Sequence, residues 1–399
     1  MKPYRQYLIL IFATNCAFAF SFSTYVMFLL SKGVSLFEVG LINIFFMVAI
    51  ALAEIPTGVF ADMLGRKFSF LISCLVTAAG LFIYFSSSSF WLFVTAEILA
   101  GIGITFKSGA LDAWVVDSVA QSGEKISNER IFSSAGITRN GAYIFGGLAG
   151  GYIGSANLAY PWLAGGLVLC LTFIWAALAM KEPNRETHLK SKSPFLAIGD
   201  ILKRSFIFGF KKRVVLLLMS AALVTSFLYQ PLNMYWQPQF SAKAGGEIWI
   251  LGWVSVLIFL SLMLGSILVK TIPAKWGRSK VLAGLVGLNS LPIIIAALMS
   301  RFWPMLALFC TYEIARGMLE PIRISFINNE IPSSERATIL SLDQVFMRIG
   351  AILGLFITGL IADHVSISVS WAFAAVAGLA AIPLFLACKP SDGGLPGTS

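Results

Sequence analysis

Four charged residues at helical spacing interrupt the apolar run 303–329. Glu313, Arg316, Glu320 and Arg323 follow one another at intervals of three, four and three residues. In an α-helix this spacing places all four on one narrow face, and their alternating signs predict ion pairs along it. Such a face can contact a polar ligand or carry protons. It can equally form a structural ladder of salt bridges against neighbouring helices, so both interpretations stay open.

A second apolar run, 90–118, carries Glu97, Lys107, Asp112 and Asp117. Glu97 and Asp112 lie deep in the run, where burial disfavours the charged form of a carboxylate and suits reversible protonation. Pairing with Lys107 would instead make either acid structural. Asp117 lies near the end of the run, where an ion-pairing role is favoured. The candidates for reversible protonation are therefore Glu97, Asp112, Glu313 and Glu320.

Two arginines, Arg139 and Arg348, occupy corresponding places in two further runs, with Asp343 about a turn from Arg348. Two buried guanidinium groups facing each other across a cavity could bind an anionic group bidentately. Each could equally neutralise the acids of the runs at 90–118 and 303–329. The residues alone do not decide between these two roles.

The run 213–240 combines amide and aromatic side chains with Pro231 and Pro238. Because proline removes a helical hydrogen bond, the sequence predicts a broken, mobile helix that lines a cavity. Part of its aromatic content also fits the belt at a membrane surface. The candidate cavity residues are Tyr229, Gln230, Asn233, Lys107, Arg139, Arg316, Arg323, Asp343 and Arg348.

Composition decides what surrounds these charges. Of 399 residues, 58% are hydrophobic and 12% are charged, a balance that a soluble domain of this size does not tolerate. A bilayer core about 30 Å thick needs about 20 apolar residues per helix. The runs of that length are 6–30, 36–60, 68–88, 90–118, 132–155, 160–180, 213–240, 247–271, 279–299, 303–329, 337–361 and 367–388. The sequence therefore predicts an all-α integral membrane protein with twelve transmembrane helices.

The formal charge of +10 follows from the membrane topology. With the N-terminus inside, only Lys32, Lys243 and Arg301 of the basic residues fall in outer segments. This asymmetry fits the positive-inside rule and predicts that both termini are cytoplasmic. The basic excess then contacts anionic lipid, and no nucleic-acid partner is expected.

Short motifs recur about 210 residues apart, which predicts two pseudo-symmetric six-helix bundles. Gly65-Arg66 returns as Gly277-Arg278, and Glu97 with Gly101 returns as Glu313 with Gly317. The expected domains are a bundle at 1–180, a cytoplasmic linker with an amphipathic helix at 181–212, a bundle at 213–390 and a disordered tail at 391–399.

The segment from Gly58 to Lys67 is a polar turn between two apolar runs. Its pattern, Gly58-x-x-x-Asp62-x-x-Gly65-Arg66-Lys67, resembles the loop 2–3 signature of the major facilitator superfamily. In that family the loop is a latch for the outward-open state, so the resemblance implies secondary transport by alternating access of two bundles.

The resemblance assigns latch roles residue by residue. Asp62 can cap a helix N-terminus, and Arg66 is expected to pair with Asp117. At the positions that repeat Gly58 and Asp62 stand Lys270 and Ala274. The predicted latch is therefore asymmetric and stronger in the first half of the chain.

Two departures from the family's patterns bear on mechanism. Many members carry a proton-coupling arginine four residues before a glycine in the fourth helix, where this chain has Glu97-x-x-x-Gly101. The stretch from Gly141 to Gly151 resembles the antiporter signature G-x-x-x-G-P-x-x-G-G, with Gly147 in place of the proline. That likeness favours export, although glycines at this spacing also serve close helix packing.

Motifs for other chemistry are missing from the sequence. It contains no nucleotide-binding G-x-x-x-x-G-K-[ST] loop and no Ser-His-Asp spacing, and its histidines, His188 and His364, fall in loops. We therefore predict a non-enzyme without cofactor or metal, driven by an ion or solute gradient.

The first expectation is proton-coupled export of a small organic solute by a monomer in the bacterial cytoplasmic membrane. The alternatives are proton-coupled uptake of a polar metabolite or chelate, and a receptor or lipid-handling protein on the same fold. Expected partners are the solute, protons or another coupling ion, and membrane lipids.

Overall fold

The structure is a computed structural model that describes residues 1–183, 212–332 and 335–388, in which every regular element is helical. The first half contains α1 (Pro3–Phe22), α2 (Tyr25–Ser31), α3 (Leu36–Leu64), α4 (Arg66–Ser86), α5 (Phe90–Ser122), α6 (Asn128–Ala156) and α7 (Tyr160–Ala179). The second half contains α9 (Arg213–Lys243), α10 (Trp249–Leu268), η1 (Val269–Thr271), η2 (Ala274–Trp276), α11 (Arg278–Ala297), α12 (Phe302–Glu330), α13 (Arg336–His364), α14 (Ile367–Gly378) and α15 (Ala381–Ala387).

These helices account for the predicted membrane spans. Within the described ranges, nine spans are long and apolar enough to cross a bilayer, and the bent pair α1–α2 makes a tenth. Helices α6 and α12 are each 29 residues long and are more polar. Together these elements match the twelve predicted runs one to one, which confirms the all-α membrane fold class.

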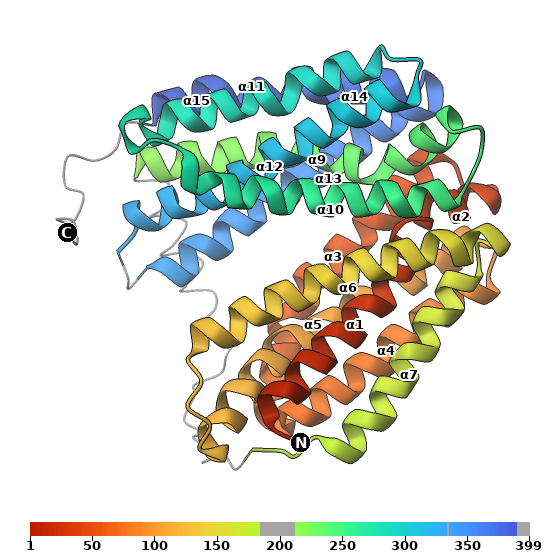
Figure 1. The fold of residues 1–399 in the computed structure, drawn as a ribbon, viewed down its shortest axis with the longest axis vertical. Helices are drawn as coiled ribbons and strands as arrows, with labels where there is room; N and C mark the ends of the chain where they lie inside the picture. Colours follow the sequence, from red (N-terminus) through yellow and green to blue (C-terminus); the bar gives the residue numbers. More distant parts are fainter. Residues whose placement is uncertain (184–211, 333–334, 389–399) are drawn as a thin grey trace. The chain divides into compact units, whose positions relative to one another are not determined.

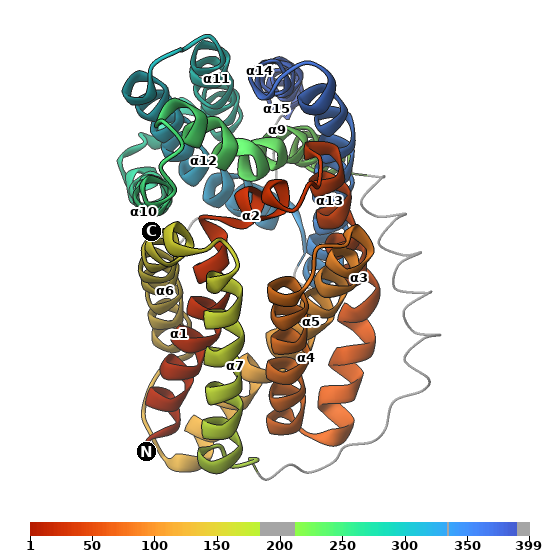
Figure 2. The same cartoon turned by 90° about the vertical axis from the view of Figure 1, so that its right-hand side faces the viewer.

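The chain folds into two compact units. Unit 1 is Met1–Leu189 with Ala244–Phe259, and unit 2 is Lys190–Lys243 with Leu260–Ser399. The predicted amphipathic helix of the linker and the predicted tail both lie outside the described residues. In unit 1, α1 packs on α6 and α7, while α5 packs on α3 and α4 (Figure 1, Figure 2). In unit 2, α9 packs on α13 and α14, and α11 packs on α12, α14 and α15.

Two repeat-related glycines perform the same packing task, one in each unit. A Cβ on Gly101 would lie 3.1 Å from the carbonyl oxygen of Phe46, and a Cβ on Gly317 would collide with that of Leu262. The two glycines are 216 positions apart in the chain, and so are the two carbonyl residues. Each close helix crossing therefore requires a residue without a side chain. The internal repeat read from the sequence thus has a physical counterpart.

Two local expectations are corrected by the structure. The run 6–30 was expected to form one helix, but α1 and α2 meet at a 46° bend, where the Ser23 hydroxyl donates to the Gly147 carbonyl at 2.8 Å. Conversely, Pro231 and Pro238 do not break α9, which continues from Arg213 to Lys243. A proline removes one backbone donor, and packing against α13 and α14 holds the helix together despite that loss.

Glycines also set the two turns that repeat each other. Gly65 precedes α4 with φ +106°, and Gly277 precedes α11 with φ +70°. Both values lie in the left-handed region that favours glycine. The approach to the second turn differs, because α10 ends at Leu268 and is followed by η1, Pro273 and η2.

Candidate functional site

The first half of the charged face on α12 forms a mixed-sign cluster with α9. Glu313 is 1% exposed, and its carboxylate lies 3.4 Å from Arg316 Nη1. The same Arg316 nitrogen donates a shorter bond, 2.7 Å, to Asn233 Oδ1. The guanidinium also lies 5.0 Å from the centre of the Tyr229 ring, within cation–π range. We call these four residues the α12–α9 cluster.

The second half of the face is a tight ion-pair network that reaches α13. Arg323 is fully buried and donates to both Asp343 carboxylate oxygens, at 2.7 and 2.9 Å. It also donates to Glu320 through Nε at 3.2 Å and Nη2 at 2.8 Å. The side chain of Glu320 is 34% exposed and that of Asp343 only 2%. We call these three residues the α12–α13 network.

The ion pairs predicted along the α12 face are thus present, and the face divides into two parts of different strength. Arg323 uses its donors on two carboxylates, whereas Arg316 gives its short bond to a neutral amide. Gln230 lies half-buried next to Tyr229, and Arg348 lies half-buried on α13. Of Glu313 and Asp343, which are both 1% exposed, Glu313 is therefore the more loosely held, because the short bond of its arginine goes elsewhere.

In unit 1, Glu97 is surrounded by phenol groups. The Tyr84 hydroxyl donates to Glu97 Oε1 at 2.9 Å and lies 3.5 Å from the Tyr25 hydroxyl. The Tyr84 ring stacks on Trp162 with centroids 3.9 Å apart. Glu97 is 8% exposed and forms no ion pair within the described part of the chain. The alternative that Glu97 pairs with Lys107 is therefore not formed among the described residues.

The remaining unit 1 candidates gather near Tyr7. Its hydroxyl donates to Asp112 Oδ1 at 2.7 Å. Lys107 Nζ lies 5.9 Å from the Phe18 ring centre. Lys107 is close enough to Asp112 to interact with it electrostatically, and Arg139 is close enough to Tyr7. Neither cation forms an ion pair with another described residue. Arg139 was expected to be buried, but it lies exposed on α6.

The predicted latch partners meet at the first Gly-Arg turn. Arg66 Nη1 donates to the Asp117 carboxylate and to the Ala113 carbonyl. The carboxylate that accepts the first backbone N–H groups of α4 belongs to Glu182, with bonds of 2.8 Å from both Arg66 and Lys67. The Lys67 ammonium donates to the Ala177 carbonyl at 2.8 Å.

The other motif residues lie differently. Asp62 is exposed in the last turn of α3, and a Cβ added at Gly58 would meet nothing within 4 Å. At Gly65, by contrast, an added Cβ would lie 3.1 Å from the Glu182 carboxyl carbon. Of the two motif glycines, Gly65 is therefore the one that its surroundings require.

At the second turn, the charged partner has become an amide. Arg278 donates to the side-chain oxygen of Asn329 at 2.9 Å, with the amide oriented by its hydrogen bonding. Arg66 and Arg278 are 212 positions apart, and so are Asp117 and Asn329. The contact at the second turn therefore keeps the arginine and has an amide in place of the acid.

Comparison with known proteins decides the family. The sequence profile of the Major Facilitator Superfamily matches residues 7–270 and 247–398. The chain belongs to this superfamily. It is 29% identical over 374 residues to an uncharacterized MFS-type transporter, YxaM, of Bacillus subtilis (strain 168), covering 91% of this chain and 89% of that protein. It is 22% identical over 312 residues to the class H tetracycline resistance protein of Pasteurella multocida, covering 75% and 74%.

Solved structures agree on the fold of this superfamily transporter. The nucleoside transporter NupG matches with a TM-score of 0.83 at 14% identity, covering 98% of this chain and all of that one. A D-xylose–proton symporter matches with a TM-score of 0.71 at 15% identity, covering 96% and 98%. The protein is therefore a multi-pass membrane transporter that acts on a small-molecule substrate.

Glycines of the antiporter-like stretch serve close packing in the transporter. A Cβ on Gly146 would lie 3.0 Å from the Cys16 carbonyl oxygen, and one on Gly150 would collide with that of Phe20. Helix α6 thus lies directly against the backbone of α1. An added Cβ at Gly141 would meet nothing within 4 Å.

Sequence reasoning missed several contacts of this transporter. Glu182 follows α7 directly, and a lone acid after a span gives no signal that it caps a helix far away in the chain. Asn329 was missed because the repeat offset of 216 that relates Gly101 to Gly317 does not lead from Asp117 to Asn329, which is 212 positions away. Asp343 was assigned to the neighbourhood of Arg348, whereas its bonds go to Arg323.

Proposed function

We propose that the protein couples movement of a small organic solute to protons, and that Glu313 is the carboxylate whose protonation changes during transport. The observation that carries the proposal is the α12–α9 cluster. Glu313 is almost fully buried, while its nearest guanidinium gives its short bond to Asn233. A buried carboxylate with a weak partner is costly when charged, so a proton or a solute cation is favoured beside it.

Contrast with the other acids sharpens the assignment. Asp343 is held by two short bonds from Arg323, which suits a permanent structural ion pair. Glu320 shares that arginine, and we assign it a minor role in coupling. Glu97 and Asp112 accept bonds from the Tyr84 and Tyr7 hydroxyls, neutral donors that can stay in place whether or not the acid is ionised. They are the proposed unit 1 counterparts of Glu313.

The chemistry of the candidate residues favours a polar or zwitterionic solute. The α12–α9 cluster offers a carboxylate, a guanidinium, an amide and an aromatic face. In unit 1, Lys107 and Arg139 add two positive charges without ion-pair partners among the described residues. An anionic group on the solute would be attracted to these cations.

We propose export as the direction. The glycine pattern of α6 is similar to the antiporter signature, and a relative is named a tetracycline resistance protein, a role that removal of a drug from the cell would serve. Uptake of a polar metabolite or chelate is the second candidate, supported by the mixed charges of the α12–α9 cluster. The distribution of Lys and Arg supports cytoplasmic termini. A monomer in a bacterial inner membrane is part of the proposal. Arg66, Asp117 and Asp62 would hold the cytoplasmic gate.

The decisive experiment is a solute screen in sealed proteoliposomes with the pH gradient imposed in each direction. Accumulation against a gradient with protein present identifies the substrate and the direction. Glu313→Gln should then abolish gradient-driven accumulation and retain solute exchange, since exchange needs no net proton movement. Glu247→Gln, an exposed acid beside Trp249, is the matched control. Accumulation by Glu313→Gln at the wild-type rate would remove Glu313 from coupling, and solute binding without any flux would favour a receptor.

A further inference from the structure

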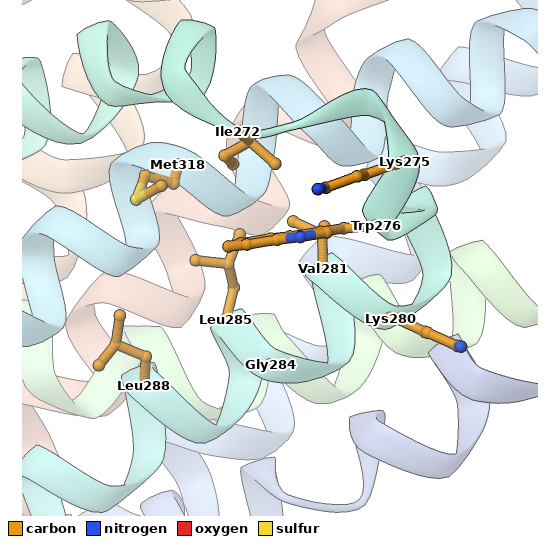
Figure 3. Close-up of a pocket in the computed structure, with 9 residues that line it drawn as sticks. All are labelled: Ile272, Lys275, Trp276, Lys280, Val281, Gly284, Leu285, Leu288 and Met318. Atoms are coloured by element: carbon orange, nitrogen blue, oxygen red, sulfur yellow. The ribbon is translucent and has the colours of Figure 1, made fainter.

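A cavity in unit 2 lies outside the charged clusters. It measures about 560 Å³ and is formed where η2 meets α11 and α12. Single-ligand sites in proteins span roughly 300–1,000 Å³, so this one has room for one ligand. Its lining residues are Ile272, Lys275, Trp276, Lys280, Val281, Gly284, Leu285, Leu288 and Met318 (Figure 3).

The lining separates into a basic side and an apolar side. Figure 3 shows Lys275, Trp276 and Lys280 toward one side of the cavity, and Leu288 and Met318 toward the other. Both charged residues of the lining are lysines, and no acid accompanies them among the lining residues. A ligand that fits must therefore carry a negative charge at one end and an apolar body at the other.

The position on α11 indicates where such a ligand comes from. Helix α11 is a candidate membrane span, and Leu288, Leu291, Ile295 and Leu298 lie exposed along it. Exposed leucine and isoleucine on a spanning helix face lipid tails. Lys280 and Leu288 are eight residues apart, which is about 12 Å along a helix, the step from headgroup level into the acyl region. Trp276 is 56% exposed, as expected of an aromatic ring at the membrane surface.

We propose that this cavity binds an anionic phospholipid from the adjacent leaflet. Its phosphate would attract the Lys275 and Lys280 ammonium groups, the second of which points outward in Figure 3 and would turn toward it, and one acyl chain would run over Leu285 toward Leu288. The occupant would tie the η1–η2 connection, which repeats the latch segment, to the membrane. The inference depends on the membrane fold and not on the proposed proton coupling or solute.

Two glycines of α11 provide a matched test. Gly284 lines the cavity and Gly287 does not, and a Cβ at either position meets nothing within 4 Å. Gly284→Leu should therefore fill the cavity, while Gly287→Leu adds the same side chain elsewhere on the helix. Lys275→Gln and Lys280→Gln remove the headgroup contacts, each with an expected affinity loss of roughly fivefold.

The measurement is lipid retention by native mass spectrometry of the purified full chain, titrated with phosphatidylglycerol or phosphatidylcholine. We expect preferential retention of phosphatidylglycerol, lost in Gly284→Leu, weakened in both lysine variants and kept in Gly287→Leu. Brominated phosphatidylglycerol should quench wild-type fluorescence more than that of Trp276→Phe. Equal retention of both lipids, or equal loss in the two leucine variants, would overturn the proposal. Displacement of the lipid by inorganic phosphate alone would also overturn it, in favour of a soluble anion site.

Thermal stability of each variant in lipid-free detergent separates binding from folding. Neither Gly284→Leu nor Gly287→Leu should lower the unfolding temperature through a clash, because an added Cβ at either position meets nothing within 4 Å. A lower unfolding midpoint for Gly284→Leu alone would assign its loss of lipid to impaired folding. The lipid retention of the two lysine variants would then decide whether the cavity binds phosphatidylglycerol.

Discussion

Removing Asp343 should destabilise unit 2 more than removing Glu320, the other carboxylate of the α12–α13 network. Arg323 is fully buried, and Asp343 supplies two of its short bonds. Asp343→Asn leaves the guanidinium buried with one charged partner, Glu320. Breaking a buried ion pair by removing one partner costs about 3–5 kcal/mol. For a protein of this size that corresponds to a fall of several degrees in the unfolding midpoint.

Glu320→Gln provides the internal comparison. Glu320 is 34% exposed, so solvent screens its interaction with Arg323. A glutamine oxygen can still accept from the guanidinium, and Asp343 stays in place. After discounting for screening, the expected cost is about 1 kcal/mol or less. The midpoint of Glu320→Gln should therefore lie close to wild type.

A double variant without the buried pair tests the reasoning directly. Arg323→Met with Asp343→Leu removes both buried charges and leaves Glu320, which is 34% exposed and so remains hydrated; replacements of a buried pair by apolar residues are often neutral. The double variant should therefore unfold at a higher temperature than Asp343→Asn, measured by intrinsic fluorescence in detergent at one heating rate. The reasoning fails if Asp343→Asn matches Glu320→Gln, or if the double variant is the least stable of the three.

Two further predictions concern the Gly-Arg turns. Gly65→Ala should lower thermal stability, because φ is +106° and the new Cβ would press on the Glu182 carboxylate at 3.1 Å, whereas Gly58→Ala in the helix interior should be neutral or stabilising. Equal midpoints for the two alanine variants would contradict this. Asn329→Asp should raise stability slightly by giving Arg278 a charged partner, and the gain should vanish in high salt. A gain that persists in high salt would point to a cause other than the ion pair.

Most of the fold was predictable because the bilayer restricts what a span can be. The ends of the twelve predicted runs differ from the helix ends by no more than four residues. Periodicity also predicted ion pairs along α12, and the structure has two of them, Glu313–Arg316 and Glu320–Arg323, each three residues apart. These contacts are local in sequence and follow from helical geometry.

Contacts between helices were harder to predict, because a single sequence does not tell which faces meet. Asp343 is 20 residues from Arg323 and on another helix, and its position gave an equally good case for Arg348. Glu182 lies 116 residues from Arg66 in the chain and accepts a hydrogen bond from its backbone N–H. The prediction that Pro231 and Pro238 break α9 was wrong for a related reason. The cost of a missing donor is fixed locally, but the packing that offsets it comes from other helices.

The structure extends the asymmetry of the latch beyond the loop itself. The sequence indicated that the second copy has lost the counterpart of Asp62. The structure adds that the acid partner is also gone, since Arg278 donates to the Asn329 amide where Arg66 donates to the Asp117 carboxylate. The bond from Arg66 to Asp117 joins two charged groups, whereas in the bond from Arg278 to Asn329 only the donor is charged. The turn at Arg278 is therefore the weaker of the two.

The proposed lipid site lies next to this weaker turn in the chain, since Trp276 and Gly277 directly precede Arg278. A phosphate held by Lys275 and Lys280 would bring to that segment the negative charge that Ala274 and Asn329 no longer provide. On this argument the first latch is held by the protein's own carboxylates and the second by the membrane. Only the second would then respond to the anionic lipid content of the bilayer.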